Sequence, residues 1–189
     1  FVANEKELPG GSVAKYLSLE FEHEDYPINF CTGLITSASM DWHAYANVTV
    51  DDIVVEVIAT AGFDETAHRA GDGYHYIESD GHFTTPHTIN LLLFTNQALT
   101  DGAMTKALIT ITEAKTVALQ EAGIRATSGM HMATGTATDG IILTIDTNGP
   151  ILTDTGTFSQ FGDTLAKAVR LAIKQALENG ERSKSEALN

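Results

Sequence analysis

The sequence contains few basic residues. Only 11 Lys and Arg stand against 25 Asp and Glu among its 189 residues, which gives a formal net charge of −14. Such an excess of negative charge repels the phosphate backbone of nucleic acids and the surface of anionic membranes. We therefore expect no nucleic-acid partner. The charge by itself indicates only a solvated surface.

Cysteine and long apolar runs are also scarce. The single cysteine, Cys31, excludes an internal disulfide and fits a reducing compartment. The longest apolar runs, such as INLLLF, are far shorter than the ~20 residues that a membrane-spanning helix needs. The first residues, FVANEKELPGG, lack the order of charge and hydrophobicity found in a signal peptide. We expect no membrane segment and a cytoplasmic location, and a sequence that begins with Phe leaves an upstream segment open.

Apolar residues recur with two different periods along the chain. Short β-branched runs predict strands at 28–38, 52–62, 87–96 and 138–146. Apolar residues spaced three or four apart predict helices from Thr100 to Gly123 and over 161–180, while 181–189 is expected to fray. This alternation predicts a single α/β domain over residues 1–189, with a mixed β-sheet covered by two long helices.

The stretch ATGTATDG at 133–140 is rich in threonine and glycine. A strand follows it rather than a helix, and it contains no lysine, so it is not a phosphate-binding P-loop. It is either a turn with local hydroxyl hydrogen bonds or a binding loop, in which the glycines allow close approach. Its candidate residues are Thr134, Gly135, Thr136, Thr138 and Asp139.

Four histidines lie in or beside a long loop that runs from Phe63 to Pro86. They are His68, His75, His82 and His87. Their spacing does not place two ligands on one face of a helix or strand, so we expect no metal site. One of them could act as a general base because the pKa of histidine lies near neutrality.

The first long helix places Lys106, Thr110 and Glu113 at positions i, i+4 and i+7. A stripe of this kind is most often a solvated face. If the face lines a cleft instead, Glu113 is a carboxylate that could orient or activate a water molecule.

Several stretches in one order resemble the adenosylcobinamide amidohydrolase (CbiZ) family, over roughly residues 33–178. They are GLITSASM (33–40), TAG (60–62) with RAGD (69–72), TINLLLFTNQALTDGAM (88–104), ITITEAKTVALQEAGI (109–124), ATGTATDGI (133–141) and FGDTLAKAVRLAIKQAL (161–177). The sequence departs from the family at Pro9, where an Asn-Gly-Gly motif is expected, and in its histidine-rich loop.

The resemblance implies hydrolysis of the amide that joins the aminopropanol arm of adenosylcobinamide to the corrin ring. The product would be adenosylcobyric acid, which re-enters coenzyme B12 synthesis. The partner is then a small molecule, a cobalt-containing corrinoid that serves as the substrate, and no cofactor is required. A non-catalytic binding or carrier protein for a corrinoid or another large metal chelate remains the alternative. A homo-oligomer also stays open.

For amide hydrolysis we expect an activated nucleophile and a stabilised oxyanion. The candidate bases are Asp139 and Glu113, the nucleophile is water or a threonine such as Thr136, and Asn90 is the candidate oxyanion donor. Replacing Asp139 by Asn is expected to reduce turnover and leave folding intact. The candidate substrate-binding residues are Asp72, His87, Asn96, Thr134, Gly135 and Thr138.

Overall fold

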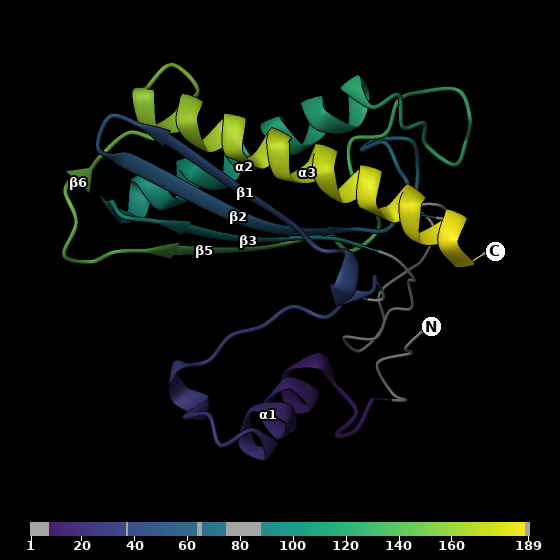
Figure 1. Cartoon of the computed structure of the whole chain (residues 1–189), viewed down its shortest axis with the longest axis horizontal. Helices are drawn as coiled ribbons and strands as arrows, with labels where there is room; N and C mark the ends of the chain where they lie inside the picture. The colour runs from purple at the N-terminus through teal and green to yellow at the C-terminus, as the bar shows by residue number, and fades with distance from the viewer. Residues whose placement is uncertain (1–7, 37, 64–65, 75–87, 188–189) are drawn as a thin grey trace.

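The computed structural model of the chain describes residues 8–36, 38–63, 66–74 and 88–187. Its helices are α1 (Val13–His23), α2 (Asp101–Glu121) and α3 (Gln160–Ala187), with short 3₁₀ turns η2 (Ile28–Phe30) and η3 (Met40–Trp42) (Figure 1). Its strands are β1 (Ala44–Val50), β2 (Ile53–Ala61), β3 (Ile89–Thr95), β4 (Ala98–Leu99), β5 (Gly140–Ile145) and β6 (Ile151–Leu152).

The main sheet has the order β1-β2-β3-β5, and it is mixed. The first three strands are antiparallel neighbours, whereas β3 and β5 run parallel. Asp51 adopts a positive φ of 50° in the two-residue turn between β1 and β2, as tight hairpins require. The short strands β4 and β6 form a separate parallel pair. The predicted α/β class with a mixed sheet is confirmed.

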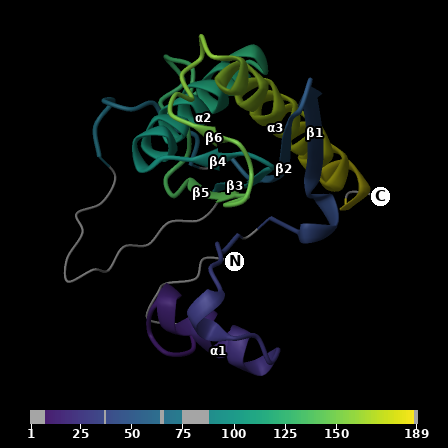
Figure 2. The same ribbon diagram turned by 90° about the vertical axis from the view of Figure 1, so that its left-hand side faces the viewer.

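Both long helices lie on the same face of this sheet (Figures 1 and 2). The inward side chains of β2 and β3 pack against them to form the core, with Val57, Leu91, Ile111 and Val169 fully buried. The opposite face of the sheet is open, because side chains such as Tyr45 and Phe94 there remain substantially exposed. The two faces of the sheet therefore have different surroundings.

Helix α2 begins and ends where its sequence predicts. The Thr100 hydroxyl accepts a hydrogen bond from the Ala103 N–H at 3.3 Å, and Gly123 adopts a φ of +71° just beyond the last turn. Helix α3 runs to Ala187, beyond the helix end that was expected at residue 180. The residues after Gly180 include no proline and consist largely of good helix formers.

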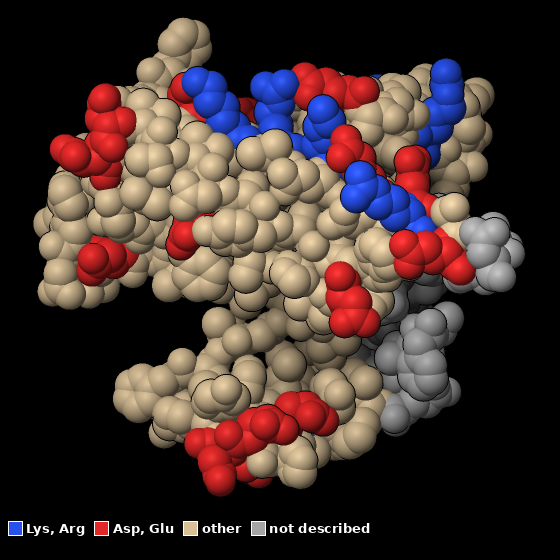
Figure 3. Space-filling view, in the orientation of Figure 1, with Lys and Arg blue, Asp and Glu red and all other residues tan. Residues whose placement is uncertain are grey.

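The N-terminal part of the chain differs most from the prediction. Residues 28–38 were expected as a strand, but the structure places η2 and an extended segment there, without a sheet partner among the described residues. Helix α1 packs on this segment, since Leu17 and Phe21 lie against Gly33. We call residues 8–36 and 38–40 the N-terminal lobe. Figure 3 shows the surface hollowed between this lobe and the sheet.

Candidate functional site

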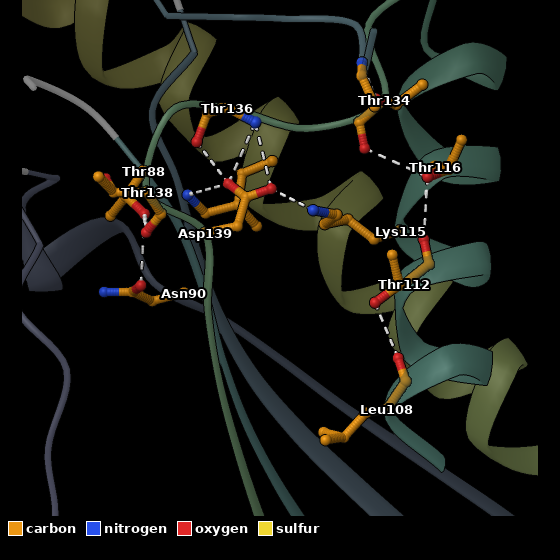
Figure 4. A network of polar contacts seen from close by, with 12 residues as sticks. Thr88, Asn90, Leu108, Thr112, Lys115, Thr116, Thr134, Thr136, Thr138 and Asp139 are labelled. Atoms are coloured by element: carbon orange, nitrogen blue, oxygen red, sulfur yellow. Dashed lines mark hydrogen bonds and ion pairs between the residues drawn. The ribbon is translucent and has the colours of Figure 1, made fainter. Parts of the chain in front are cut away.

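The Asp139 carboxylate lies at the centre of a hydrogen-bond network just before β5 (Figure 4). It forms an ion pair with Lys115 of α2, and the two side chains are only 14% and 8% exposed. The Thr136 hydroxyl donates a hydrogen bond to the same carboxylate. The backbone N–H groups of Thr136 and Ile89 also donate to it, each at 3.2 Å from Oδ1. Four donors therefore fix this carboxylate.

Glycine at position 135 makes this close arrangement possible. A Cβ atom added there would lie 2.5 Å from Asp139 Oδ2 and 2.8 Å from Lys115 Nζ. Both separations are shorter than atoms of these kinds tolerate, so any side chain would displace the ion pair. Gly135 thus leaves the space that the ion pair occupies.

A second polar group lies at the start of β3, beside the same loop. The Thr88 hydroxyl donates to the Thr138 carbonyl oxygen and lies 3.5 Å from Asn90 Oδ1. Asn90 Nδ2 donates to the Ile35 carbonyl oxygen at 2.7 Å. This hydrogen bond joins the N-terminal lobe to the end of the sheet, and the Asn90 side chain that makes it is only 4% exposed.

The described part of the histidine-rich loop pairs with the threonine-rich loop. The His68 N–H donates to the Gly135 carbonyl oxygen at 2.9 Å, and the Thr134 N–H donates to the His68 carbonyl oxygen at 2.9 Å. The Thr134 hydroxyl accepts from the Ala70 N–H at 3.0 Å. Two residues further along, Asp72 forms an ion pair with Arg69 at 3.7 Å. Asp72 therefore lies on a segment that contacts the site.

Five of the stretches quoted for the family resemblance meet at this end of the sheet. The Thr60 hydroxyl donates to the Thr36 hydroxyl at 3.3 Å, which joins TAG to GLITSASM. Asn90 of TINL contacts the lobe, and Lys115 of TEAK pairs with Asp139 of ATGTATDG. Segments far apart in the sequence thus place their polar side chains together, as a functional site requires.

Two of the expected residues are not brought to this group. Asn96 lies at the other end of β3, where its side chain accepts from the Val54 N–H at 2.9 Å and donates to the Asp52 carbonyl oxygen at 2.8 Å. Glu113 is exposed on α2. It lies two residues from Lys115, so it points about 200° away around the helix axis. His87 lies outside the described residues.

The three residues of α2 that were expected to share a solvated face differ in their exposure to solvent. Lys106 is exposed and pairs with Asp154 at 2.6 Å, and this hydrogen bond lowers the pKa of the Asp154 carboxyl. Thr110, by contrast, is 1% exposed and donates to the Thr155 carbonyl oxygen at 2.9 Å. Thr110 therefore belongs to the core rather than to the solvated surface of the helix.

Lys115 is the site residue that we did not predict from the sequence. It lies four residues after Ile111 and four before Leu119, both fully buried, so it occupies the apolar stripe of α2. A lysine in such a position needs a buried anion as its partner. This interruption of an apolar helical stripe is the signal that could have identified it.

Across the part of the chain that the structure describes, no three His, Cys, Asp or Glu side chains gather as a metal site would require. Three of the four histidines of the predicted cluster, His75, His82 and His87, lie outside that part. No helix among the described residues is long and apolar enough to cross a membrane.

A hydroxyl that donates to a carboxylate, itself paired with a lysine, is an arrangement suited to acyl transfer. The model of the adenosylcobinamide amidohydrolase (CbiZ) family matches residues 2–185. The chain belongs to this family, so the resemblance predicted from its motifs is confirmed.

Three curated relatives illustrate the similarity. The uncharacterized protein MJ1613 of Methanocaldococcus jannaschii is 40% identical over 164 residues, which cover 80% of this chain and 64% of the relative. The adenosylcobinamide amidohydrolase of Methanosarcina mazei is 30% identical over 155 residues, or 77% of this chain and 66% of the relative. The protein of that name from Halobacterium salinarum is 27% identical over 134 residues, or 71% and 54%.

This chain therefore spans between 54% and 66% of the length of these curated relatives. No solved structure is significantly similar to it.

Proposed function

We propose that the chain hydrolyses the aminopropanol amide of adenosylcobinamide to adenosylcobyric acid, for the reuse of corrinoids in coenzyme B12 synthesis. One structural observation carries the proposal beyond family membership. The Asp139 carboxylate accepts a hydrogen bond from the Thr136 hydroxyl and also forms an ion pair with the Lys115 ammonium. These three side chains can supply a nucleophile, a proton acceptor and a fixed positive charge.

In the first step the Thr136 oxygen attacks the carbonyl carbon of the amide, and Asp139 accepts the hydroxyl proton. A carbon–oxygen bond forms, and the carbonyl oxygen becomes an oxyanion. Negative charge thus moves from Asp139 to the substrate. The Lys115 ammonium balances that charge before and after the transfer, so the site needs little rearrangement during the step.

In the second step the oxyanion collapses and the carbon–nitrogen bond breaks. The proton held by Asp139 passes to the departing amine, which leaves as aminopropanol. The corrin acid is then bound to Thr136 as an ester. Water attacks this ester and Asp139 takes a proton from the water. That proton returns to the Thr136 oxygen as the ester bond breaks, which releases adenosylcobyric acid and restores the site.

The neighbouring polar residues have supporting roles in this proposal. Asn90 is a positioning residue, because its amide joins the start of β3 to the N-terminal lobe. Thr134, Thr138 and Asp72 lie on the two loop segments that border Thr136, where a polar substrate would meet them. None of these steps calls for a cofactor, and the cobalt ion belongs to the substrate.

Incubation of the protein with adenosylcobinamide, followed by chromatography and mass analysis, tests the proposal. We expect free aminopropanol and adenosylcobyric acid in equal amounts. Thr136→Val removes the hydroxyl while keeping the shape of the side chain, and it should reduce the rate at least ~100-fold.

Thr112→Val provides a matched control for this experiment. Thr112 is exposed on α2 and its hydroxyl donates to the Leu108 carbonyl oxygen at 2.8 Å, away from Asp139 (Figure 4). This variant should hydrolyse the substrate like the parent. A parent protein that binds adenosylcobinamide and returns it unchanged would be a carrier instead. Equal rates for Thr136→Val and Thr112→Val would remove Thr136 from the mechanism.

A further inference from the structure

The open face of the sheet carries a row of apolar side chains across all four strands. Tyr45 lies opposite Ile58, Ile58 opposite Leu92, and Leu92 opposite Ile142. Residues that are directly opposite on neighbouring strands point to the same face. Tyr45 is 52% exposed, and the other three are partly exposed. The row therefore forms a broad apolar surface that neither long helix covers.

The next row along the strands adds an aromatic ring and polar groups. It consists of Asn47, Glu56, Phe94 and Thr144, again directly opposite one another. Phe94 is 39% exposed, whereas Asn47 and Tyr45 both donate hydrogen bonds to Glu56. The bond to Glu56 raises the pKa of the Tyr45 phenol. This row thus offers hydrogen-bonding groups beside an apolar centre.

The apolar surface is continuous with the candidate site. In the other direction along the strands, the row that precedes it contains Thr60, Asn90 and Gly140. Thr60 and Asn90 are the residues that bond the N-terminal lobe to the sheet. The apolar surface therefore ends at a row that contacts the N-terminal lobe and lies beside the end of the threonine-rich loop.

The charge carried by the side chains of these rows is of one sign. Glu56 is the single charged residue among the side chains of these rows. On the side of the molecule shown in Figure 3, Lys and Arg gather along α3, and none lies around the hollow. The chain as a whole carries a formal charge of −14. An apolar ligand with a net positive charge would be favoured here over an anionic one.

We propose that this sheet face is the platform on which the corrin ring of the substrate lies. The inference rests on the proposed function for the identity of the ligand. A corrin is a flat, largely apolar macrocycle with amide groups around its rim. With cobalt(III) and an alkyl ligand it carries net positive charge. Its plane fits the apolar rows, its rim amides match Asn47 and Thr144, and one arm would extend past Asn90 to Thr136.

Phe94→Ser tests the platform, because it removes an exposed aromatic ring from the surface without touching the core. The Kd of adenosylcobinamide, measured by absorbance titration, should rise about tenfold. KM should rise in parallel, while the effect on kcat is small. Phe94→Leu, which keeps an apolar side chain, should recover most of the affinity. Phe158→Ser is the control, because Phe158 is fully exposed elsewhere, in the segment before α3.

The binding and turnover measurements separate failure of the platform from failure of the proposed function. A parent that binds the corrinoid but does not hydrolyse it, with weaker binding in Phe94→Ser, contradicts the function and retains the platform. A parent that hydrolyses it, with equal Kd in Phe94→Ser and Phe158→Ser, overturns the platform alone. A shift of Phe94→Ser to a smaller species in gel filtration, without a change in Kd, would assign the face to a second copy of the chain. Absence of corrinoid binding by the parent also overturns the platform.

Discussion

Lys115 of α2 and Asp139 of the loop before β5 form an ion pair in which both side chains are largely buried. The pair joins α2 to the end of the main sheet. Removing one partner of a buried pair leaves the other charge without compensation, which costs far more than the pair contributes. Stability and activity are therefore coupled at this position.

Asp139→Asn should lower the free energy of unfolding by about 3 kcal/mol, because the Lys115 ammonium would then be buried without a counter-charge. This revises the expectation from the sequence that asparagine would leave folding intact. Urea denaturation measures the change. Asp163→Asn is the control, since Asp163 forms an exposed pair with Lys167 at 2.6 Å. It should cost less than about 1 kcal/mol.

The double variant Lys115→Met/Asp139→Asn separates stability from catalysis. It removes both charges, so most of the lost stability should return. Hydrolysis of adenosylcobinamide should stay at least ~100-fold below that of the parent, because the proton acceptor is absent. A double variant that recovers both stability and rate would show that the pair is purely structural.

An ester on Thr136 predicts that a second nucleophile can compete with water. Turnover in the presence of hydroxylamine should yield the hydroxamate of the corrin acid together with the free acid, and mass analysis distinguishes the two. Release of aminopropanol should be unaffected at low hydroxylamine concentration if formation of the ester limits the rate. Formation of the acid alone at every hydroxylamine concentration would favour direct attack by water.

Glu113→Gln should change the rate of hydrolysis by less than twofold. The carboxylate is exposed and points away from Lys115 around α2, so it is not placed to act on a substrate beside Thr136. Steady-state kinetics on the purified variant is the measurement. A loss of tenfold or more would return Glu113 to the list of candidate bases.

The sequence predicted the core elements because their patterns are local. The apolar runs of β2 and β3 and the helical spacing of α2 lie where the pattern placed them. The pattern failed for residues 28–38, where β-branched side chains are typical of a strand but the part of the chain that the structure describes offers no neighbouring strand. It also missed β1, although Ala44 and Ala46 alternate there with exposed Tyr45 and Asn47.

Part of the candidate site could be predicted because some of its residues are close together in the sequence. Thr136 and Asp139 share one short loop, so the sequence shows them together. Lys115 belongs to a separate helix, and only tertiary packing brings it to Asp139. Asn90 and Asn96 looked alike as polar residues of one strand, yet six residues along a strand separate them by ~20 Å. Spacing in the sequence could not show which end of β3 faces the loop.

Treatment with a chelator should leave the rate unchanged, because the proposed steps use only side chains and water. The protein is dialysed against EDTA and assayed with adenosylcobinamide, whose cobalt is held by the corrin ring. Loss of activity that zinc or iron restores would require a metal site, and the histidines of the 63–86 region would be the first residues to test.

Gly135→Ala is expected to impair both folding and turnover through the ion pair. A methyl group at this position would lie 2.5 Å from Asp139 Oδ2 and 2.8 Å from Lys115 Nζ, so the pair must separate or the loop must move. Either response displaces Asp139 from the Thr136 hydroxyl. We expect a loss of about 1–3 kcal/mol in the free energy of unfolding, as for other overpacked sites, and a fall in kcat of at least ~10-fold, because small displacements of catalytic groups are costly.

Gly102→Ala in the first turn of α2 is the matched control, since no atom lies within 4 Å of its added Cβ. Alanine there should be neutral or stabilise the protein by up to about 1 kcal/mol. If Gly135→Ala melts and hydrolyses like Gly102→Ala, the close packing of Gly135 against Lys115 and Asp139 has no part in the function.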